Sequence, residues 1–91
     1  MPIPVSANAA MMLSRKTLEA EIAAQLRARG AGKTIWPSDV ARALAEDWRP
    51  LMPAVREVAA DMAERGAVVV SQKGAPVDAL TATGPIRLGL P

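Results

Sequence analysis

The hydrophobic pattern of this chain changes its period once, at Gly66, and that change limits the folds that the chain can adopt. Before Gly66, apolar residues recur three and four positions apart in separate segments, which is the spacing that places them on one face of a helix. After Gly66, the β-branched run "AVVVSQK" and the alternating "GPIRLGL" are typical of strands. The sequence therefore predicts an α+β domain in which helices come first and strands follow.

Three helices are expected, near 14–29, 37–46 and 50–65. Ser14 can cap the first helix, and Gly30 follows its last turn, where a glycine commonly ends a helix. Pro37 suits the first turn of the second helix, because a proline there has no hydrogen bond to lose. Pro53 is tolerated in the third helix only close to its start, so we expect that helix to begin near residues 49–51.

Two strands are expected, near 67–72 and 86–90, and they should pair antiparallel. The stretch between them, "APVDALTAT", is too long for a tight hairpin turn and contains a rigid Pro76-Val77, so we interpret it as a wing. This order predicts a winged helix-turn-helix, with three helices followed by a two-stranded antiparallel wing. The side chains expected in the core are those of Leu18, Ile22, Leu26, Ile35, Val40, Leu44, Leu51, Val55, Val58, Met62, Val68, Val70, Ile86 and Leu88.

The length of 91 residues suits one compact domain, which we assign to residues 14–91, with residues 1–13 as an N-terminal tail. The chain contains no histidine and no cysteine, so the usual general base, the commonest neutral metal ligand and thiolate chemistry are all missing. Its carboxylates are scattered, and no signature marks a serine nucleophile. We therefore expect the protein not to be an enzyme and to need no cofactor or metal.

The stretch "RGAGKT", from Arg29 to Thr34, matches the end of the phosphate-binding loop of nucleotide hydrolases. The full motif needs an earlier glycine, and Arg27 occupies its position. The motif must also follow a strand and open a helix, whereas the segment before it here is predicted to be helical. We therefore expect these glycines to end a helix, and Lys33 to be a solvent-facing loop residue.

The chain carries 11 basic and 9 acidic residues, and its net charge of +2 does not by itself indicate a nucleic-acid partner. No apolar run approaches the ~20 residues of a membrane span. The start of the chain lacks the basic region of a secretory signal. We expect a cytoplasmic protein that makes no membrane contact.

Three stretches, "TIWPSDVARAL", "WRPLMPAVREVA" and "VSQKGAPVDALTATGPIRL", together cover most of residues 33–90. In these stretches the chain resembles a small bacterial winged-helix family catalogued as a domain of unknown function. The resemblance implies the winged-helix fold, but it brings no known activity, cofactor or catalytic residue. Trp36 departs from the pattern, because a smaller residue is expected before the proline of "PSDVA".

The fold implied by both arguments makes duplex DNA the first candidate partner. In the usual winged geometry the third helix enters the major groove while the wing touches the backbone or the minor groove. The outward face of the third helix is acidic at Glu57, Asp61 and Glu64, however, so we expect weak binding by a monomer. The residues expected to contact nucleic acid are Ser38, Arg42, Arg49, Arg56, Lys73 and Arg87.

The alternative is a protein-interaction or regulatory module that uses the same scaffold without binding DNA. The acidic face of the third helix and the nearly neutral charge favour this interpretation. Trp36 and Trp48 could anchor a partner if they were exposed, although tryptophans in a chain without Phe or Tyr are expected in the core. The oligomeric state is left open by the sequence.

Overall fold

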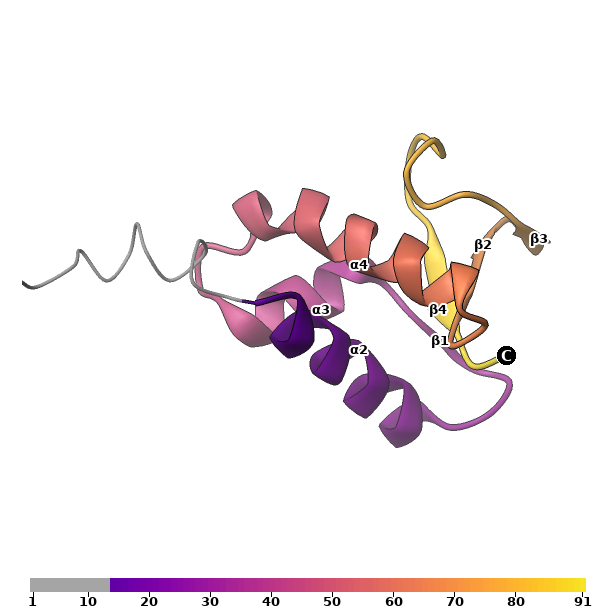
Figure 1. Ribbon diagram of the computed structural model, residues 1–91, viewed down its shortest axis with the longest axis horizontal. Helices are drawn as coiled ribbons and strands as arrows, with labels where there is room; N and C mark the ends of the chain where they lie inside the picture. Colours follow the sequence, from indigo (N-terminus) through magenta and orange to yellow (C-terminus); the bar gives the residue numbers. More distant parts are fainter. Residues whose placement is uncertain (1–13) are drawn as a thin grey trace, which may run out of the picture.

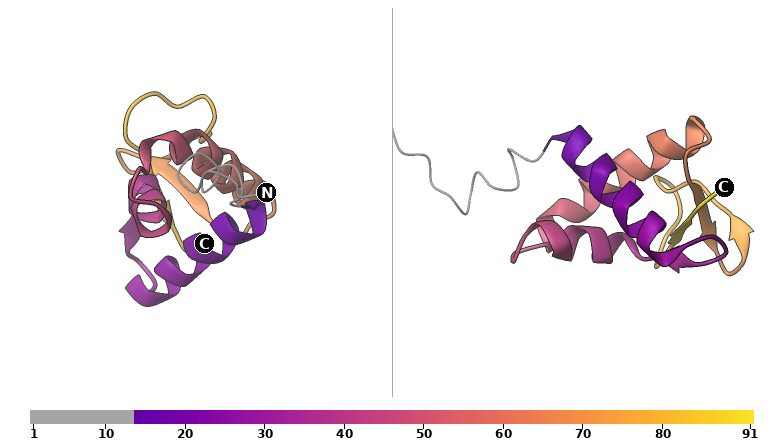
Figure 2. Two further views of the ribbon diagram at one scale, coloured as in Figure 1. Left: turned by 90° about the vertical axis from the view of Figure 1, so that its left-hand side faces the viewer. Right: turned by 90° about the horizontal axis from the view of Figure 1, so that it is seen from below.

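The computed structural model describes residues 14–91, and the tail assigned to residues 1–13 lies outside them (Figure 1). The helices pack together at one end of the domain and a small sheet closes the other end (Figures 1 and 2). In chain order the elements are α2 (Arg15–Arg29), β1 (Thr34–Ile35), α3 (Pro37–Leu44), the 3-10 helix η1 (Arg49–Leu51), α4 (Met52–Glu64), β2 (Val69–Gln72), β3 (Ala75–Pro76) and β4 (Arg87–Gly89).

Helix α2 begins and ends as its capping residues predict. The Ser14 hydroxyl accepts a hydrogen bond from the Thr17 N–H at 3.1 Å. Gly30 has a φ of 91°, a conformation that side chains disfavour, and its N–H donates to the Leu26 carbonyl at 2.9 Å. A strand, β1, follows the glycines, so "RGAGKT" joins a helix to a strand. This order is the reverse of the one that a phosphate-binding loop needs.

The prolines start the other helices. Pro37 occupies the first turn of α3 and is itself buried. The segment from Arg49 to Leu51 forms a 3-10 turn before α4 proper begins at Met52, and Pro53 falls in the first turn of α4. The missing proline N–H therefore removes no hydrogen bond from the helix interior.

The sheet has four antiparallel strands in the order β1-β4-β2-β3, so the prediction of a two-stranded wing is wrong. Strand β1 pairs with β4 in the register Thr34↔Gly89, where a Cβ at Gly89 would lie 3.4 Å from the Thr34 methyl carbon, an ordinary contact distance. Strand β3 pairs with β2 across a two-residue turn, Lys73-Gly74, in which both residues have positive φ. That is the arrangement of a type I′ hairpin turn.

Residues 77–85, which we call the wing loop, leave β3 and return to β4 on the α4 side of the domain (Figures 1 and 2). The wing loop does not project freely into solvent. The Val77 N–H donates to the Val70 carbonyl at 3.0 Å, and Ala79 is 1% exposed. The Gln72 amide donates to the carbonyls of Thr83 and Pro85 at 2.6 and 3.0 Å.

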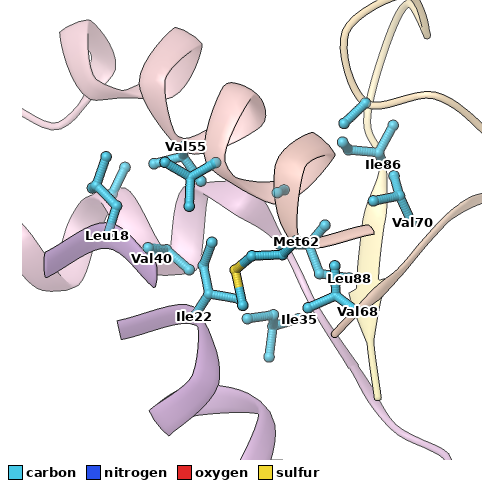
Figure 3. Close-up of a cluster of buried hydrophobic side chains, with 14 of the residues drawn as sticks. Leu18, Ile22, Ile35, Val40, Val55, Met62, Val68, Val70, Ile86 and Leu88 are labelled. Carbon is cyan, nitrogen blue, oxygen red and sulfur yellow. The ribbon is translucent and has the colours of Figure 1, made fainter. Parts of the chain in front are cut away.

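The core is aliphatic and continuous from the helices to the sheet (Figure 3). All the side chains predicted to form it are buried except Leu44, the last residue of α3, which is half-buried and packs against the core. Ala41, Ala59 and Ala79 join the core and allow the elements to approach closely. No helix within residues 14–91 is long and apolar enough to cross a membrane.

Candidate nucleic-acid interface

Two tryptophans lie near the surface, where the chain enters α3 and η1. The backbone of Trp36 is extended (φ −94°, ψ 147°) because Pro37 follows it. The backbone N–H of Trp36 donates to the Asp39 carboxylate at 2.8 Å. Trp36 is 38% exposed, whereas Trp48 is half-buried and packs against the edge of the core. The expectation that the tryptophans lie in the core is therefore wrong for Trp36. It is met only in part by Trp48, whose side chain is half-buried.

The two indoles line one shallow depression of about 330 Å³. It lies between the start of α3, the start of α4 and the end of the wing loop. Besides the tryptophans, its lining residues are Pro37, Ser38, Met52, Arg56, Gly84, Pro85 and Ile86. The structure thus brings the predicted residues Ser38 and Arg56 beside both tryptophans.

Three arginines from three different elements stack on the two rings. The guanidinium carbons of Arg42 in α3 and Arg49 in η1 each lie 4.6 Å from the centroid of the Trp48 ring. The guanidinium carbon of Arg87 in β4 lies 3.9 Å from the Trp36 ring, and the Arg87 side chain also donates to the Thr34 hydroxyl at 3.0 Å. These cation–π contacts hold the guanidinium groups in place while leaving them at the surface.

Lys73 reaches the same region from the β2–β3 turn. A second depression, of about 530 Å³, shares Trp36 with the first and is also lined by Lys73 and Arg87. Lys73 has a φ of 51° and is the one residue other than glycine with positive φ within residues 14–91. Glycine and asparagine are the residues that ordinarily occupy this conformation.

Six residues thus form one surface, which we call the cation–tryptophan face: Trp36, Arg42, Trp48, Arg49, Lys73 and Arg87. Glu46 and Asp47 are exposed in the turn just before Trp48. Neither makes an ion pair with another residue of the 14–91 region. The negative charges of Glu46 and Asp47 offset part of the positive charge of this face. Its cations therefore act on groups in direct contact with them rather than through a strong field around the whole face.

Arg56 has a structural role that the sequence does not reveal. Its guanidinium donates to three carbonyls of the wing loop: Ala79 at 3.3 Å, Ala82 at 2.9 Å and Gly84 at 2.6 Å. Those bonds use three of its five N–H donors. Arg56 therefore ties the wing loop to α4, and it lies at the edge of the depression with its charge directed largely to backbone oxygens.

The carboxylates of α4 face the wing loop. Glu57, Asp61 and Glu64 line a third depression together with wing-loop residues. Asp61 pairs with Arg65 at 2.9 Å, and Arg65 also contacts Glu19 of α2 at 3.1 Å. The hydrogen bond to Glu19, supported by the charge of Asp61, raises the pKa of Arg65 above its ordinary value.

No three acidic side chains in the described part of the chain lie close enough together to hold a metal ion. A comparison with curated proteins found no significant match. The model of one family, described as "Protein of unknown function (DUF3253)", matches residues 15–91, which is nearly the whole chain. The chain belongs to that family of unknown function.

Proposed function

We propose that the chain is a cytoplasmic winged-helix module that binds duplex DNA through the cation–tryptophan face. The element order supports the winged-helix part of this proposal. Helix α2, strand β1, the helix pair α3 and α4, and strands β2 and β4 with a long connection between them follow the order expected for that fold. Strand β3 and the docking of the wing loop on α4 are additions to it.

The observation that carries the DNA proposal is the stacking of three arginines on two indoles, with Lys73 lining a depression that Trp36 also lines. Arg42, Arg49, Lys73 and Arg87 come from α3, η1, the β2–β3 turn and β4. Guanidinium groups suit phosphate oxygens because their planar donors bind two oxygens at once. Groups supplied by both the helical end and the hairpin can contact phosphates at separate points along a duplex.

The conformation of Lys73 supports the proposal independently. A side chain at positive φ costs roughly 1 kcal/mol in backbone energy, which glycine avoids and asparagine partly offsets. Strained residues concentrate at functional sites. A lysine at the tip of this hairpin therefore favours a binding role for its ammonium group.

The acidic face of α4 limits the mode of binding. Carboxylates at Glu57 and Glu64 would meet phosphate repulsion in a major groove, and base readout prefers arginine, asparagine or glutamine. The proposed binding therefore consists chiefly of phosphate contacts. We expect it to be weak, of low sequence specificity and sensitive to salt.

Fluorescence anisotropy with a labelled duplex at increasing salt tests the proposal. Four phosphate contacts at ~0.9 each predict a slope of about −3.6 for log K against log salt. Lys73→Ala and Arg87→Ala should each weaken binding to every duplex and reduce the slope by about 0.9. The matched control is Arg27→Ala, which removes an exposed arginine from the last turn of α2, away from this face. No binding at low salt, or an equal loss from the control, would refute the proposal.

A second variant separates binding from folding. Lys73→Asn converts the turn to Asn-Gly, the favoured type I′ pair, and should raise the free energy of unfolding by about 0.5–1 kcal/mol. The same change should lower DNA affinity because it removes a cation. Urea denaturation and anisotropy measure the two effects. A variant that was both more stable and equally tight in binding would show that Lys73 does not contact DNA.

A further inference from the structure

We infer that the groove between α4 and the wing loop is a docking site for a basic amphipathic helix of a partner protein. The groove has a volume of about 550 Å³ and lies beyond Arg56 along α4. Its apolar lining comes from Ala60 and Ala63 of α4 and from Val77, Ala79 and Leu80 of the wing loop. This surface is separate from the cation–tryptophan face, because the two share no lining residue.

The apolar part of the groove suits the ridge of an incoming helix. Ala60, Ala63 and Val77 are half-buried, so they form a shallow floor of small side chains to which another backbone can come close. Leu80 is 61% exposed, the largest exposure among the big hydrophobic residues of 14–91. A leucine or methionine of the partner would cover Leu80 and rest on the alanines, as in other complexes in which a helix fills a groove.

The charges around the groove favour a partner that is positively charged. Glu57, Asp61, Glu64 and Asp78 line it, against the single cation Arg15 among its described lining residues. Asp61 is already paired with Arg65, but Glu57 and Glu64 make no ion pair within residues 14–91. DNA and acidic peptides would be repelled here. Lysines or arginines beside the apolar ridge of a helix would complement these carboxylates.

The groove is already formed in the free protein, so a partner need not order the loop. Arg56 ties the carbonyls of Ala79, Ala82 and Gly84 to α4. The Asp78 carboxylate accepts a hydrogen bond from the Leu80 backbone N–H at 2.8 Å. This bond fixes the local backbone conformation of the loop at its exposed leucine. Preorganisation of this kind lowers the entropic cost of binding.

The test is a titration of the isotopically labelled protein with a short amphipathic peptide of leucine and lysine, followed by NMR. Saturable amide shifts should centre on Glu57, Ala60, Glu64 and Leu80. A peptide of the same composition, scrambled so that no apolar face forms, should bind more weakly. The same amphipathic peptide with glutamate in place of lysine should not bind.

Variants locate the site and separate it from DNA binding. Glu57→Gln and Glu64→Gln should each lower peptide affinity about two- to fivefold, as expected for ion pairs at a surface. Leu80→Ser should lower it at least as much, and the exposure of Leu80 makes this change compatible with folding. The matched control Glu46→Gln removes an exposed carboxylate outside the groove and should have no effect.

Lys73→Ala should leave peptide binding unchanged, because Lys73 does not line this groove. The DNA proposal and this inference can therefore fail independently of each other. Shifts that mapped to the cation–tryptophan face, equal binding of the scrambled peptide, or unchanged affinity in the glutamine variants would overturn the inference. Binding that depended on the carboxylates but not on Leu80 would overturn it as well, because it would indicate simple attraction between opposite charges.

Discussion

Replacing Arg56 by alanine should destabilise the protein more than any other single arginine change. The side chain is half-buried, and its guanidinium makes three hydrogen bonds to wing-loop carbonyls. Without it, the carbonyls of Ala79, Ala82 and Gly84 would lose their common donor. Ala79, which is 1% exposed, would lose the clamp that keeps it in the core.

The size of the effect follows from the number and setting of these bonds. A hydrogen bond to a charged group contributes about 1.5–3 kcal/mol when it is well shielded. The Gly84 carbonyl belongs to an exposed residue, and water can replace part of what is lost. We therefore take ~1 kcal/mol for each bond and expect a total loss of about 3 kcal/mol. For a domain of this size that corresponds to a fall in Tm of roughly 12–24 °C.

Thermal unfolding followed by circular dichroism measures the change, with Arg27→Ala as the control for loss of an exposed arginine. Arg56→Lys should recover only part of the stability, because one ammonium group cannot span three carbonyls. Hydrogen exchange should show the Ala82 N–H, which donates to the Asp78 carbonyl at 2.9 Å, losing protection in Arg56→Ala. A fall in Tm of less than about 4 °C, or under ~1 kcal/mol, would refute the clamp.

Three further predictions concern other parts of the chain. Val58→Asp should abolish the folded state, seen as loss of the cooperative thermal transition, because position 58 is 2% exposed and the aspartate would be an unpaired buried charge. Titration with Mg-ATP should produce no saturable amide shifts over residues 30–34, since a helix precedes that loop; shifts at sub-millimolar nucleotide would contradict this. Glu57→Gln should strengthen DNA binding in anisotropy measurements by removing repulsion from phosphate, while Asp61 is a poorer choice because its loss also breaks the pair with Arg65.

The ionisation of Arg65 predicts no stability change across neutral pH. Its pKa is raised by the hydrogen bond to Glu19, so its contribution is fully present below the ordinary arginine pKa and is lost only at still higher pH. Urea midpoints measured for wild type and Arg65→Gln should therefore stay a constant distance apart from pH 7 to pH 9. A gap that closed within that interval would contradict the assignment.

Helix positions and the core could be predicted because local signals determine them. Ser14, Gly30 and the prolines act on neighbouring backbone groups, and the spacing of Leu18, Ile22 and Leu26 alone identifies the buried side of α2. The end of α3 is less well predicted, because no strong stop signal follows Leu44 and the expected helix is two residues longer than the observed one.

The sheet and the Arg56 clamp depend on contacts between distant residues, which a single sequence does not specify. Pairing of β1 with β4 joins residues more than fifty positions apart, and proline is disfavoured in strands, so the sequence gives no local signal for β3 at Ala75–Pro76. Nothing near Arg56 in the sequence indicates that the carbonyls of residues 79–84 lie above it. The positive charge of Arg56 suggests a phosphate contact, whereas three of its N–H donors bind carbonyls of the wing loop.

The placement of both tryptophans on one face has an optical consequence. The chain contains no tyrosine, so its intrinsic ultraviolet emission comes entirely from Trp36 and Trp48. Nucleic acid bound at the cation–tryptophan face would quench or shift that emission, because bases and phosphates would displace water and guanidinium groups from the rings. A peptide without aromatic residues in the groove beside α4 would leave the emission largely unchanged. The unlabelled protein therefore carries its own reporter of which of its two surfaces is occupied.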